Sequence, residues 1–290
     1  MKHKIAMLGG SVRERIVAES LRANHFSVAS YAMDNADHIQ SISAEECLSD
    51  AAALILPVRS NDEDARIGGT SDLCPVTITG DLLAHLMPNA PIYCGIGSHR
   101  LRELSEKTRH PLKEIMEYDA VAVPNAVLTA EGTMDYVMKC SDVSLADLRI
   151  TVFGFGRVGK ACVRLFSAAG SRVTVFCRSE TDLRKGRDLG FDIRYYSGAP
   201  AVLPKTDILI NTVPSVVVTP KEISLLKQNS KIIDLASLPG GVDRASAEAY
   251  GIEAVMLPGL PGKYAPISAG RILASYYLEE LKNLRGGDIQ

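Results

Sequence analysis

The segment Ile150–Phe166, "ITVFGFGRVGKACVRLF", joins an apolar run to an amphipathic pattern with helical spacing through a glycine-rich turn. Gly154, Gly156 and Gly159 stand there in G-x-G-x-x-G spacing. In such a turn the first glycine allows the tight bend, the second lets a pyrophosphate approach the backbone, and the third lets the helix pack on the strand. The helix N-terminus adds N–H donors that favour a phosphate. The segment therefore predicts a dinucleotide-binding fold.

Short β-rich apolar runs that alternate with helical patterns predict six strands in the second half of the chain. They are Arg149–Phe153, Arg172–Cys177, Asp192–Tyr195, Asp207–Asn211, Lys231–Asp234 and Glu253–Met256. A complete doubly wound dinucleotide-binding sheet has this number of parallel strands, and its ligand lies outside their carboxyl ends. Because the polar segment Ser141–Arg149 precedes the first strand, we expect the dinucleotide-binding domain to cover residues 144–270.

The first half of the chain shows a weaker version of the same pattern. The predicted strands are Lys4–Leu8, Ala52–Val58, Pro91–Gly95 and Ala120–Val123. The segment 8–21, "LGGSVRERIVAESL", supplies a glycine turn and a helix but lacks the full glycine fingerprint, so it predicts either scaffold or a nucleotide site. We expect an α/β fold of two Rossmann-like domains with a cleft between them, residues 1–143 forming the substrate side.

The C-terminal residues 271–290 are expected to form a helix that packs back on the N-terminal domain. Apolar side chains recur there on or near one helical face. They are Ile272, Leu273, Tyr276, Tyr277, Leu281 and Leu284.

Bulk composition excludes several classes of protein. Of 290 residues, 46% are hydrophobic and 23% charged, with a net charge of −2, so no nucleic-acid partner is expected. The cysteines form no C-x-x-C pair and the histidines no ligand pair, which predicts reduced thiols and no metal. Neither a signal peptide nor an apolar run of roughly 20 residues occurs, so we expect a cytoplasmic protein without membrane contact.

The end of the second strand favours NADP over NAD. The segment 173–180, "VTVFCRSE", places Cys177, Arg178 and Ser179 where an NAD-preferring site has an acid for the ribose 2′-OH. An arginine can pair with a 2′-phosphate and stack on adenine. The alternative is that Arg178 is merely exposed and Glu180 binds the ribose.

Two further strand ends are expected to line the nicotinamide. Thr212, Val213 and Pro214 follow the fourth strand, and Ser237 follows the fifth. Since ligands lie outside the carboxyl ends of parallel strands, these residues are candidates for cofactor contact. The alternative is ordinary turn chemistry, in which Pro and Gly only close a strand.

The loop Leu257–Gly270, "LPGLPGKYAPISAG", follows the sixth strand. Its prolines stiffen the path and its glycines allow close approach of a ligand. Lys263 and Tyr264 offer one cation and one phenol, which suit carboxylate binding or proton transfer. A rigid interdomain linker is the alternative.

A segment of the first half is expected to face that loop across the cleft. In residues 120–139, "AVAVPNAVLTAEGTMDYVMK", a predicted strand gives way to a helix near Asn125, Thr129 and Glu131. Thr129 and Glu131 could instead be a helix N-cap and a first-turn acid.

His99 and Arg100 are candidates for a general base and a carboxylate ligand, or else only a polar helix start.

Several of these segments resemble the family of dipicolinate synthase A subunits from spore-forming bacteria. They are "PNAVLTAEG" (124–132), "NTVPS" (211–215), "DLASLPGGVD" (234–243), "LPGLPGKYAPISAG" and the glycine turn. The resemblance covers essentially the whole chain, from "AMLGGSVRE" to the last helix. It implies a protein built like the 2-hydroxyacid and alanine dehydrogenases. Such a protein oxidises dihydrodipicolinate to dipicolinate with NADP and a flavoprotein-like B subunit, in the mother cell of a sporulating bacterium.

Residues and resemblance together assign the site. Catalysis is expected of Glu131 and Lys263, and substrate binding of Asn125, Thr129, Tyr264 and Ser268. The cofactor is expected at Gly154, Gly156, Arg157, Val158, Gly159, Arg178, Ser179, Thr212, Val213, Pro214, Ser237, Gly259 and Gly262. A homo-oligomer is also expected.

Two other functions stay open at this point. One is an NADP-dependent dehydrogenase of the 2-hydroxyacid or shikimate type. Enzymes of the 2-hydroxyacid type need a cleft histidine, but no histidine follows His110 in this chain. The other is a non-catalytic NADP-binding regulatory subunit.

Overall fold

The structure, a computed structural model, describes residues 3–34, 41–58, 63–67 and 75–282. Its contacts divide the chain into two compact units, which we call unit 1 (residues 1–125 and 265–290) and unit 2 (residues 126–264). The first boundary falls inside helix α5 (Asp119–Cys140), upstream of the polar segment at which the sequence placed it.

Unit 1 is built on a parallel five-stranded sheet with strand order β2-β1-β3-β6-β7. The strands are β1 (Lys4–Leu8), β2 (Ser27–Tyr31), β3 (Ala51–Ile55), β6 (Ile92–Cys94) and β7 (Leu112–Glu114). This is a flavodoxin-like order, in which the direction of winding reverses between β1 and β3. A separate antiparallel pair joins β4 (Arg66–Ile67) to β5 (Val76–Thr77).

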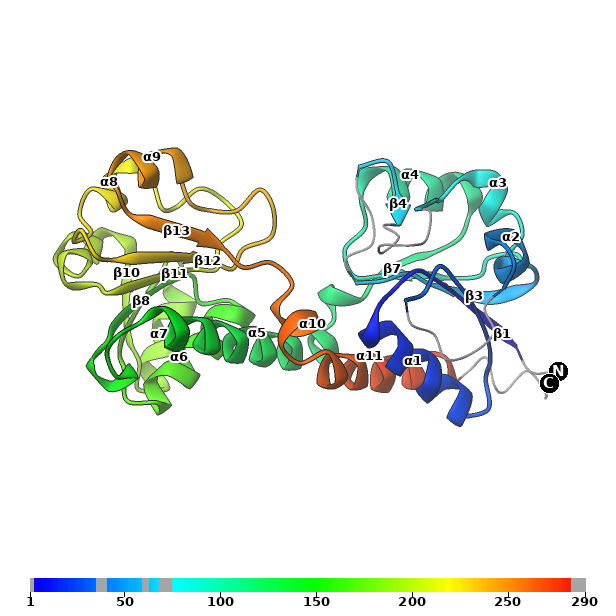
Figure 1. The fold of residues 1–290 in the computed structure, drawn as a ribbon, viewed down its shortest axis with the longest axis horizontal. Helices are drawn as coiled ribbons and strands as arrows, with labels where there is room; N and C mark the ends of the chain where they lie inside the picture. The colour runs from blue at the N-terminus through cyan, green and yellow to red at the C-terminus, as the bar shows by residue number, and fades with distance from the viewer. Residues whose placement is uncertain (1–2, 35–40, 59–62, 68–74, 283–290) are drawn as a thin grey trace. The chain divides into compact units, whose positions relative to one another are not determined.

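Helices cover both faces of the unit 1 sheet (Figure 1). One apolar core lies under α2 (Ala44–Leu48), α3 (Gly80–Leu83) and α4 (His99–Thr108). The other lies under α1 (Val12–Ala23) and α11 (Pro266–Glu280). The second core contains the C-terminal helix because Leu273, Tyr276 and Tyr277 are buried in it. Leu284, which the sequence placed on the same helical face, lies outside the described residues.

Close approach of α11 to α1 depends on Gly270. A Cβ atom at this position would lie 2.7 Å from the Cβ of Ile16 and 2.8 Å from the carbonyl oxygen of Arg13. Helix α11 also contacts the sheet, since the Tyr277 ring lies edge-on to the Tyr93 ring of β6 with 5.5 Å between centroids. The glycine that ends the "SAG" segment is therefore a packing residue between two helices.

The predicted strand Ala120–Val123 is wrong, because these residues lie in the first turn and a half of α5. A short apolar run does not distinguish a strand from a helix, and the alanines here favour the helix. Pro124 sits inside α5, where it lacks the N–H that would bond to the fourth residue before it. Strands β2 and β7 were not predicted, since "SVASY" and "LKE" carry too many polar residues.

Unit 2 contains a parallel six-stranded sheet with strand order β10-β9-β8-β11-β12-β13. The strands are β8 (Arg149–Phe153), β9 (Arg172–Cys177), β10 (Asp192–Tyr195), β11 (Ile208–Asn211), β12 (Lys231–Asp234) and β13 (Glu253–Met256). Five have the predicted bounds, and β11 begins one residue later. The order is that of a complete dinucleotide-binding Rossmann sheet. This fold class is therefore confirmed for both units.

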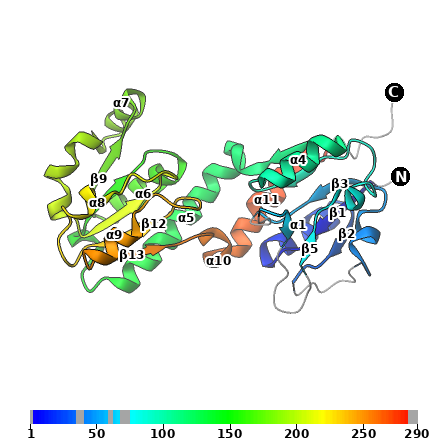
Figure 2. The ribbon, with the colours of Figure 1, turned by 90° about the horizontal axis from the view of Figure 1, so that it is seen from above.

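Two helical layers enclose the unit 2 sheet (Figure 1). Helices α6 (Arg157–Ala168) and α7 (Glu180–Asp188) share one core with α5. Helices α8 (Pro220–Ile223) and α9 (Arg244–Ala249) share the other with short 3-10 turns. In Figure 2 the chain passes from β13 directly into α10 (Leu260–Tyr264).

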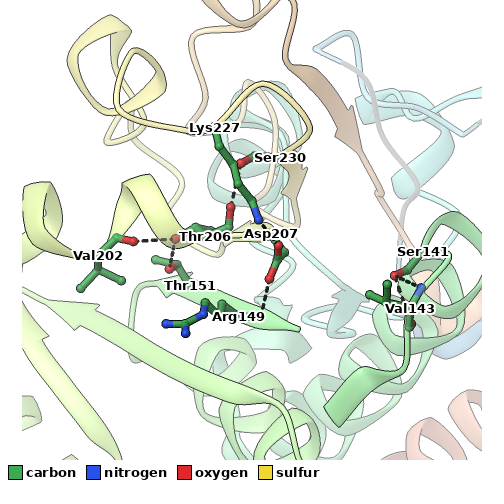
Figure 3. Close-up of polar contacts among 9 residues, drawn as sticks. All are labelled: Ser141, Val143, Arg149, Thr151, Val202, Thr206, Asp207, Lys227 and Ser230. Atoms are coloured by element: carbon green, nitrogen blue, oxygen red, sulfur yellow. Dashed lines mark hydrogen bonds and ion pairs between the residues drawn. The ribbon is translucent and has the colours of Figure 1, made fainter. Parts of the chain in front are cut away.

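Polar contacts fix the amino ends of the central unit 2 strands (Figure 3). The Asp207 carboxylate accepts the Arg149 N–H at 2.7 Å and pairs with the Lys227 ammonium. The hydroxyls of Thr151 and Thr206 lie 2.7 Å apart, and Ser230 donates to the Thr206 carbonyl at 2.7 Å. These contacts tie the amino ends of β8, β11 and β12 together, and ligands of such sheets lie at the opposite, carboxyl edge.

We predict that Gly270→Val destabilises the protein by about 1–3 kcal/mol, because overpacking outweighs the better helix propensity of valine. Denaturant unfolding measures this change. Gly80→Ala is the control, since a Cβ there meets only Thr108 Cγ2 at 3.8 Å. The control should leave stability unchanged or raise it by up to about 1 kcal/mol. Equal stability of the two variants would contradict the close packing of α11 on α1.

Candidate dinucleotide-binding site

The three glycines of the β8–α6 turn have different surroundings. Gly154 has φ +99°, and a Cβ there would lie 2.4 Å from Thr212 Oγ1. At Gly159 a Cβ would lie 2.1 Å from the carbonyl oxygen of Gly154. Gly156 is exposed and has no atom within 4 Å of a Cβ position. The first and third glycines thus close the turn from inside, and the second faces the open side, where a pyrophosphate fits.

Thr212 ties the glycine turn to the next strand. Its backbone N–H and its hydroxyl both donate to the Phe153 carbonyl at 2.9 Å. The Val213 side chain also closes on Gly154, whose Cβ would lie 2.8 Å away. Thr212 and Val213 therefore shape the turn, while Pro214 beyond them is exposed at the carboxyl edge.

A buried polar network that sequence reasoning missed joins the loops after β11 and β12. Asn211 is fully buried and donates to the Asp234 carboxylate at 2.8 Å. The same carboxylate accepts the N–H groups of Ala236 at 3.1 Å and Gly241 at 2.9 Å. Asn211 also bonds both ways to the Val213 backbone. A buried carboxylate needs such donors, so the network fixes both loops that flank the expected nicotinamide position.

The end of β9 separates the roles of Arg178 and Ser179. The Ser179 hydroxyl caps α7, accepting the Asp182 N–H at 3.0 Å and donating to the Asp182 carboxylate at 2.8 Å. Arg178 is exposed. Glu180, the alternative ribose ligand, pairs with Arg184 one helical turn away. Arg178 is thus the group most available for a phosphate at this strand end.

Tyr196 is an aromatic neighbour of this strand end that the sequence did not suggest. Its ring stacks on Phe176 at 6.2 Å and meets Phe153 edge-on at 5.1 Å. Tyr195 pairs with Cys177 in the sheet, so Tyr196 follows β10 at the height where Arg178 follows β9. Burial raises the pKa of Tyr196 to about 12, which keeps its phenol protonated at neutral pH.

The expected loop Leu257–Gly270 is mostly helical, which corrects the sequence interpretation. Residues 260–264 form α10 and residues from 266 onward form α11. Gly132 of α5 makes room for α10, because a Cβ there would lie 3.2 Å from the Cβ atoms of Leu260 and Tyr264. Gly259 provides the turn into α10 with φ +70°.

The remaining candidates in this segment are distributed over both units. Gly262 is half-buried, and Lys263 and Tyr264 are exposed, all within α10 in unit 2. Ser268 is exposed in the first turn of α11, in unit 1. Ser237 is exposed beyond β12. Arg157 and Val158 open α6, where Gly156 leaves the helix N-terminus without a side-chain cap.

The substrate candidates of α5 do not share one face. Asn125 and Thr129 lie four residues apart, on the same side of the helix. Glu131 follows Thr129 by two residues, which turns it away from that side. Thr129 is buried, and its carbonyl accepts the Thr133 hydroxyl at 2.8 Å. Thr129 is not a helix N-cap, because α5 begins at Asp119.

Other candidate groups have structural surroundings. His99 and Arg100 open α4 after the Ser98 cap, and both contact Glu103 on an exposed surface. Burial raises the pKa of the Cys94 and Cys162 thiols to about 12, so neither is a thiolate at neutral pH. The described part of the chain has no group of three or more His, Cys, Asp or Glu arranged for a metal ion. Within that part, no helix combines the length and the apolar character needed to cross a bilayer.

The sheet order and the open glycine turn define a dehydrogenase-type dinucleotide-binding fold. An NAD-complexed D-isomer specific 2-hydroxyacid dehydrogenase from Lactobacillus delbrueckii ssp. bulgaricus shares this fold. The TM-score is 0.58, with 11% identity and 98% of each chain covered. At this identity the likeness shows the fold alone.

More similar relatives identify the family. The family model for the N-terminal domain of the dipicolinate synthase A subunit matches residues 4–116. The chain is 30% identical over 278 residues to the dipicolinate synthase A subunit of Bacillus subtilis (strain 168), covering 94% of this chain and 93% of the relative. The crystal structure of the dipicolinate synthase A subunit from Bacillus halodurans has a TM-score of 0.90, 31% identity and 97% coverage of both chains. The chain belongs to the family of dipicolinate synthase A subunits. Family and fold together support an oxidoreductase of the nicotinamide-dinucleotide type.

We predict that Gly156→Val abolishes dinucleotide binding while the protein stays folded, because its side chain would occupy the space that a pyrophosphate needs. Calorimetric titration with NADPH and NADH, beside thermal melting, measures both effects. Gly159→Val is the matched comparison and should lower stability by more than about 3 kcal/mol, since its Cβ meets backbone. A folded Gly156→Val protein with unchanged affinity would show that the turn is structural only.

Proposed function

We propose that this chain oxidises dihydrodipicolinate to dipicolinate with NADP⁺, acting with a dipicolinate synthase B subunit of flavoprotein-like character. Membership of the family of dipicolinate synthase A subunits, on a Rossmann sheet with an open glycine turn, carries this proposal. The same membership supports a cytoplasmic location in the mother cell of a sporulating bacterium, and we include a homo-oligomer in the proposal.

The glycine turn suits a dinucleotide in shape. Gly156 offers open space, and the α6 N-terminus beside it has no side-chain cap. In the proposal the cofactor lies along Gly154–Gly159. The residues near its nicotinamide are Thr212, Val213, Pro214 and Ser237. Gly259 and Gly262 also contact the cofactor. Bound NADP⁺ would supply the hydride acceptor.

The reaction requires that the protein bind the substrate and that one group accept a proton. A hydride and a proton both leave the dihydropyridine ring, and the aromatic ring that results favours the step. We propose that Glu131 or Lys263 takes part in this proton transfer. Contacts with the substrate are assigned to Asn125, Thr129, Tyr264 and Ser268. Because the substrate is a dianion, cations and amide donors should matter more than a nucleophile.

Preference for NADP rests on Arg178 in this proposal. It is exposed at the end of β9, and the two neighbours that could replace it are engaged elsewhere. Ser179 caps α7, and Glu180 pairs with Arg184. An arginine fork matches a phosphate in charge and geometry, whereas a 2′-hydroxyl would gain little from it.

We predict that the purified chain, mixed with its B subunit, NADP⁺ and dihydrodipicolinate, produces dipicolinate and NADPH in equal molar amounts. The NADPH is measured by the absorbance of the reduced nicotinamide. The measurement is a single-turnover absorbance trace with product analysis. Omitting the B subunit shows whether the chain turns over alone. If NADP⁺ binds but no reduction follows in either mixture, the chain is non-catalytic and the proposed reaction is wrong.

We predict that Arg178→Ala weakens NADPH binding by about 1.5–3 kcal/mol, the range for hydrogen bonds to charged groups, and leaves NADH binding nearly unchanged. Calorimetric titration measures both. Arg184→Ala is the matched control, since it removes an exposed arginine from the adjoining helix. Glu180→Gln tests the alternative ribose ligand. Loss of NADH affinity in that variant, with an intact NADPH affinity in Arg178→Ala, would reverse the assignment.

A further inference from the structure

Unit 1 contains a buried arginine whose hydrogen-bonding capacity is largely unused. Arg13 lies in the first turn of α1, and its side chain is only 10% exposed. Its Nε donates to Glu14 at 3.0 Å. Among the residues that the structure describes, its two terminal amino groups have no hydrogen-bond or ion-pair partner. Neither amino group is among the fully buried polar atoms that lack a partner, so both reach the surface, where they can form further hydrogen bonds.

Several contacts hold the residues around Arg13 in place. Glu14 accepts the Ser11 N–H at 3.0 Å and the Val58 N–H at 3.4 Å, which holds the carboxylate between the loops after β1 and β3. Gly270 of α11 packs against the Arg13 carbonyl, so α11 lies beside the first turn of α1. A guanidinium held in this way loses little entropy when it binds a ligand.

Arg13 stands at the position where an open α/β sheet binds its ligands. The strand order of unit 1 reverses between β1 and β3, and the loops that follow these two strands are the ones that Glu14 connects. Ligands of such sheets lie outside the carboxyl ends of the strands at this switch point. Gly9 and Gly10 directly follow β1 with φ +68° and +116°.

The chemistry of the ligand follows from the remaining groups. The Glu14 carboxylate already occupies the Ser11 N–H, so a nucleotide phosphate has a competitor in this turn. The terminal amino groups of Arg13 form the edge of the fork that matches a carboxylate in two parallel bonds. Two other cations of unit 1 are engaged in ion pairs, Arg102 with Glu114 and Lys113 with Glu280.

We propose that Arg13 binds a carboxylate of the substrate, at a subsite on the carboxyl edge of the unit 1 sheet that takes small organic carboxylates. This inference rests on the proposed function, because it supplies the cation that a pyridine dicarboxylate needs. It also resolves the two interpretations of the "LGGSVRE" segment: the glycine turn positions an arginine and does not hold a nucleotide.

The experiment titrates pyridine-2,6-dicarboxylate and pyridine-2-carboxylate into the full chain by calorimetry. Arg13→Ala should weaken binding of the dicarboxylate by roughly 10- to 150-fold and reduce the preference for it over the monocarboxylate. Arg13→Lys keeps the charge without the fork and should recover part of the loss. Arg22→Ala is the matched control, since Arg22 lies in the last turn of the same helix and donates to the Val28 carbonyl, and this variant should bind as the wild type does.

NADPH affinity and thermal melting of the same samples separate the possible outcomes. Unchanged dicarboxylate affinity in folded Arg13→Ala, or in Arg13→Lys if the alanine variant does not fold, overturns the proposal. No dicarboxylate binding by the wild type overturns it as well. Arg13-dependent binding without turnover would keep the subsite and remove only the proposed reaction.

Discussion

The steric contact between Gly159 and Gly154 is the constraint on which the unit 2 site depends. Helix α6 can approach the end of β8 only because no side chain stands at Gly159, where a Cβ would lie 2.1 Å from the Gly154 carbonyl. Thr212 and Val213 pack against the inner side of the same turn. They connect it to the next strand, β11. Gly156 is then the part of the turn that faces open space. A single close contact therefore sets both the packing of the first helix and the opening for a pyrophosphate.

The central strands of unit 2, β8, β11 and β12, were predictable because such strands are buried on both faces and appear as continuous apolar runs. In unit 1 this signal is weaker. Strand β2 is only half-buried and carries serines, and β7 is three residues of mixed polarity, so neither differs from a loop in sequence. The run before Pro124 is apolar and short, which fits both a strand and a helix, and the continuation into α5 decided for the helix.

The site was predictable where its geometry is local. The glycine spacing determines a turn within six residues, so the sequence alone located it. Ser179 was identified by its place after β9, but the cap it forms on α7 depends on where the helix starts. The Asn211–Asp234 network and the burial of Arg13 involve partners distant in sequence. No periodicity or spacing reports such contacts, because they exist only after the sheets and α11 have assembled.

The two units use one local architecture in opposite ways. In each unit the first strand of the parallel sheet is followed by a glycine turn and a helix at the carboxyl edge. In unit 2 the helix begins at a glycine without a cap, which leaves the N–H groups of the first turn for an anion from outside. In unit 1 the protein provides the anion itself, since Glu14 bonds to the Ser11 N–H and to Arg13. The internal carboxylate removes a phosphate site but fixes an arginine. The two turns therefore differ both in their glycine spacing and in the acidic side chain that closes the unit 1 turn, and we infer that these differences separate a dinucleotide site from a carboxylate site.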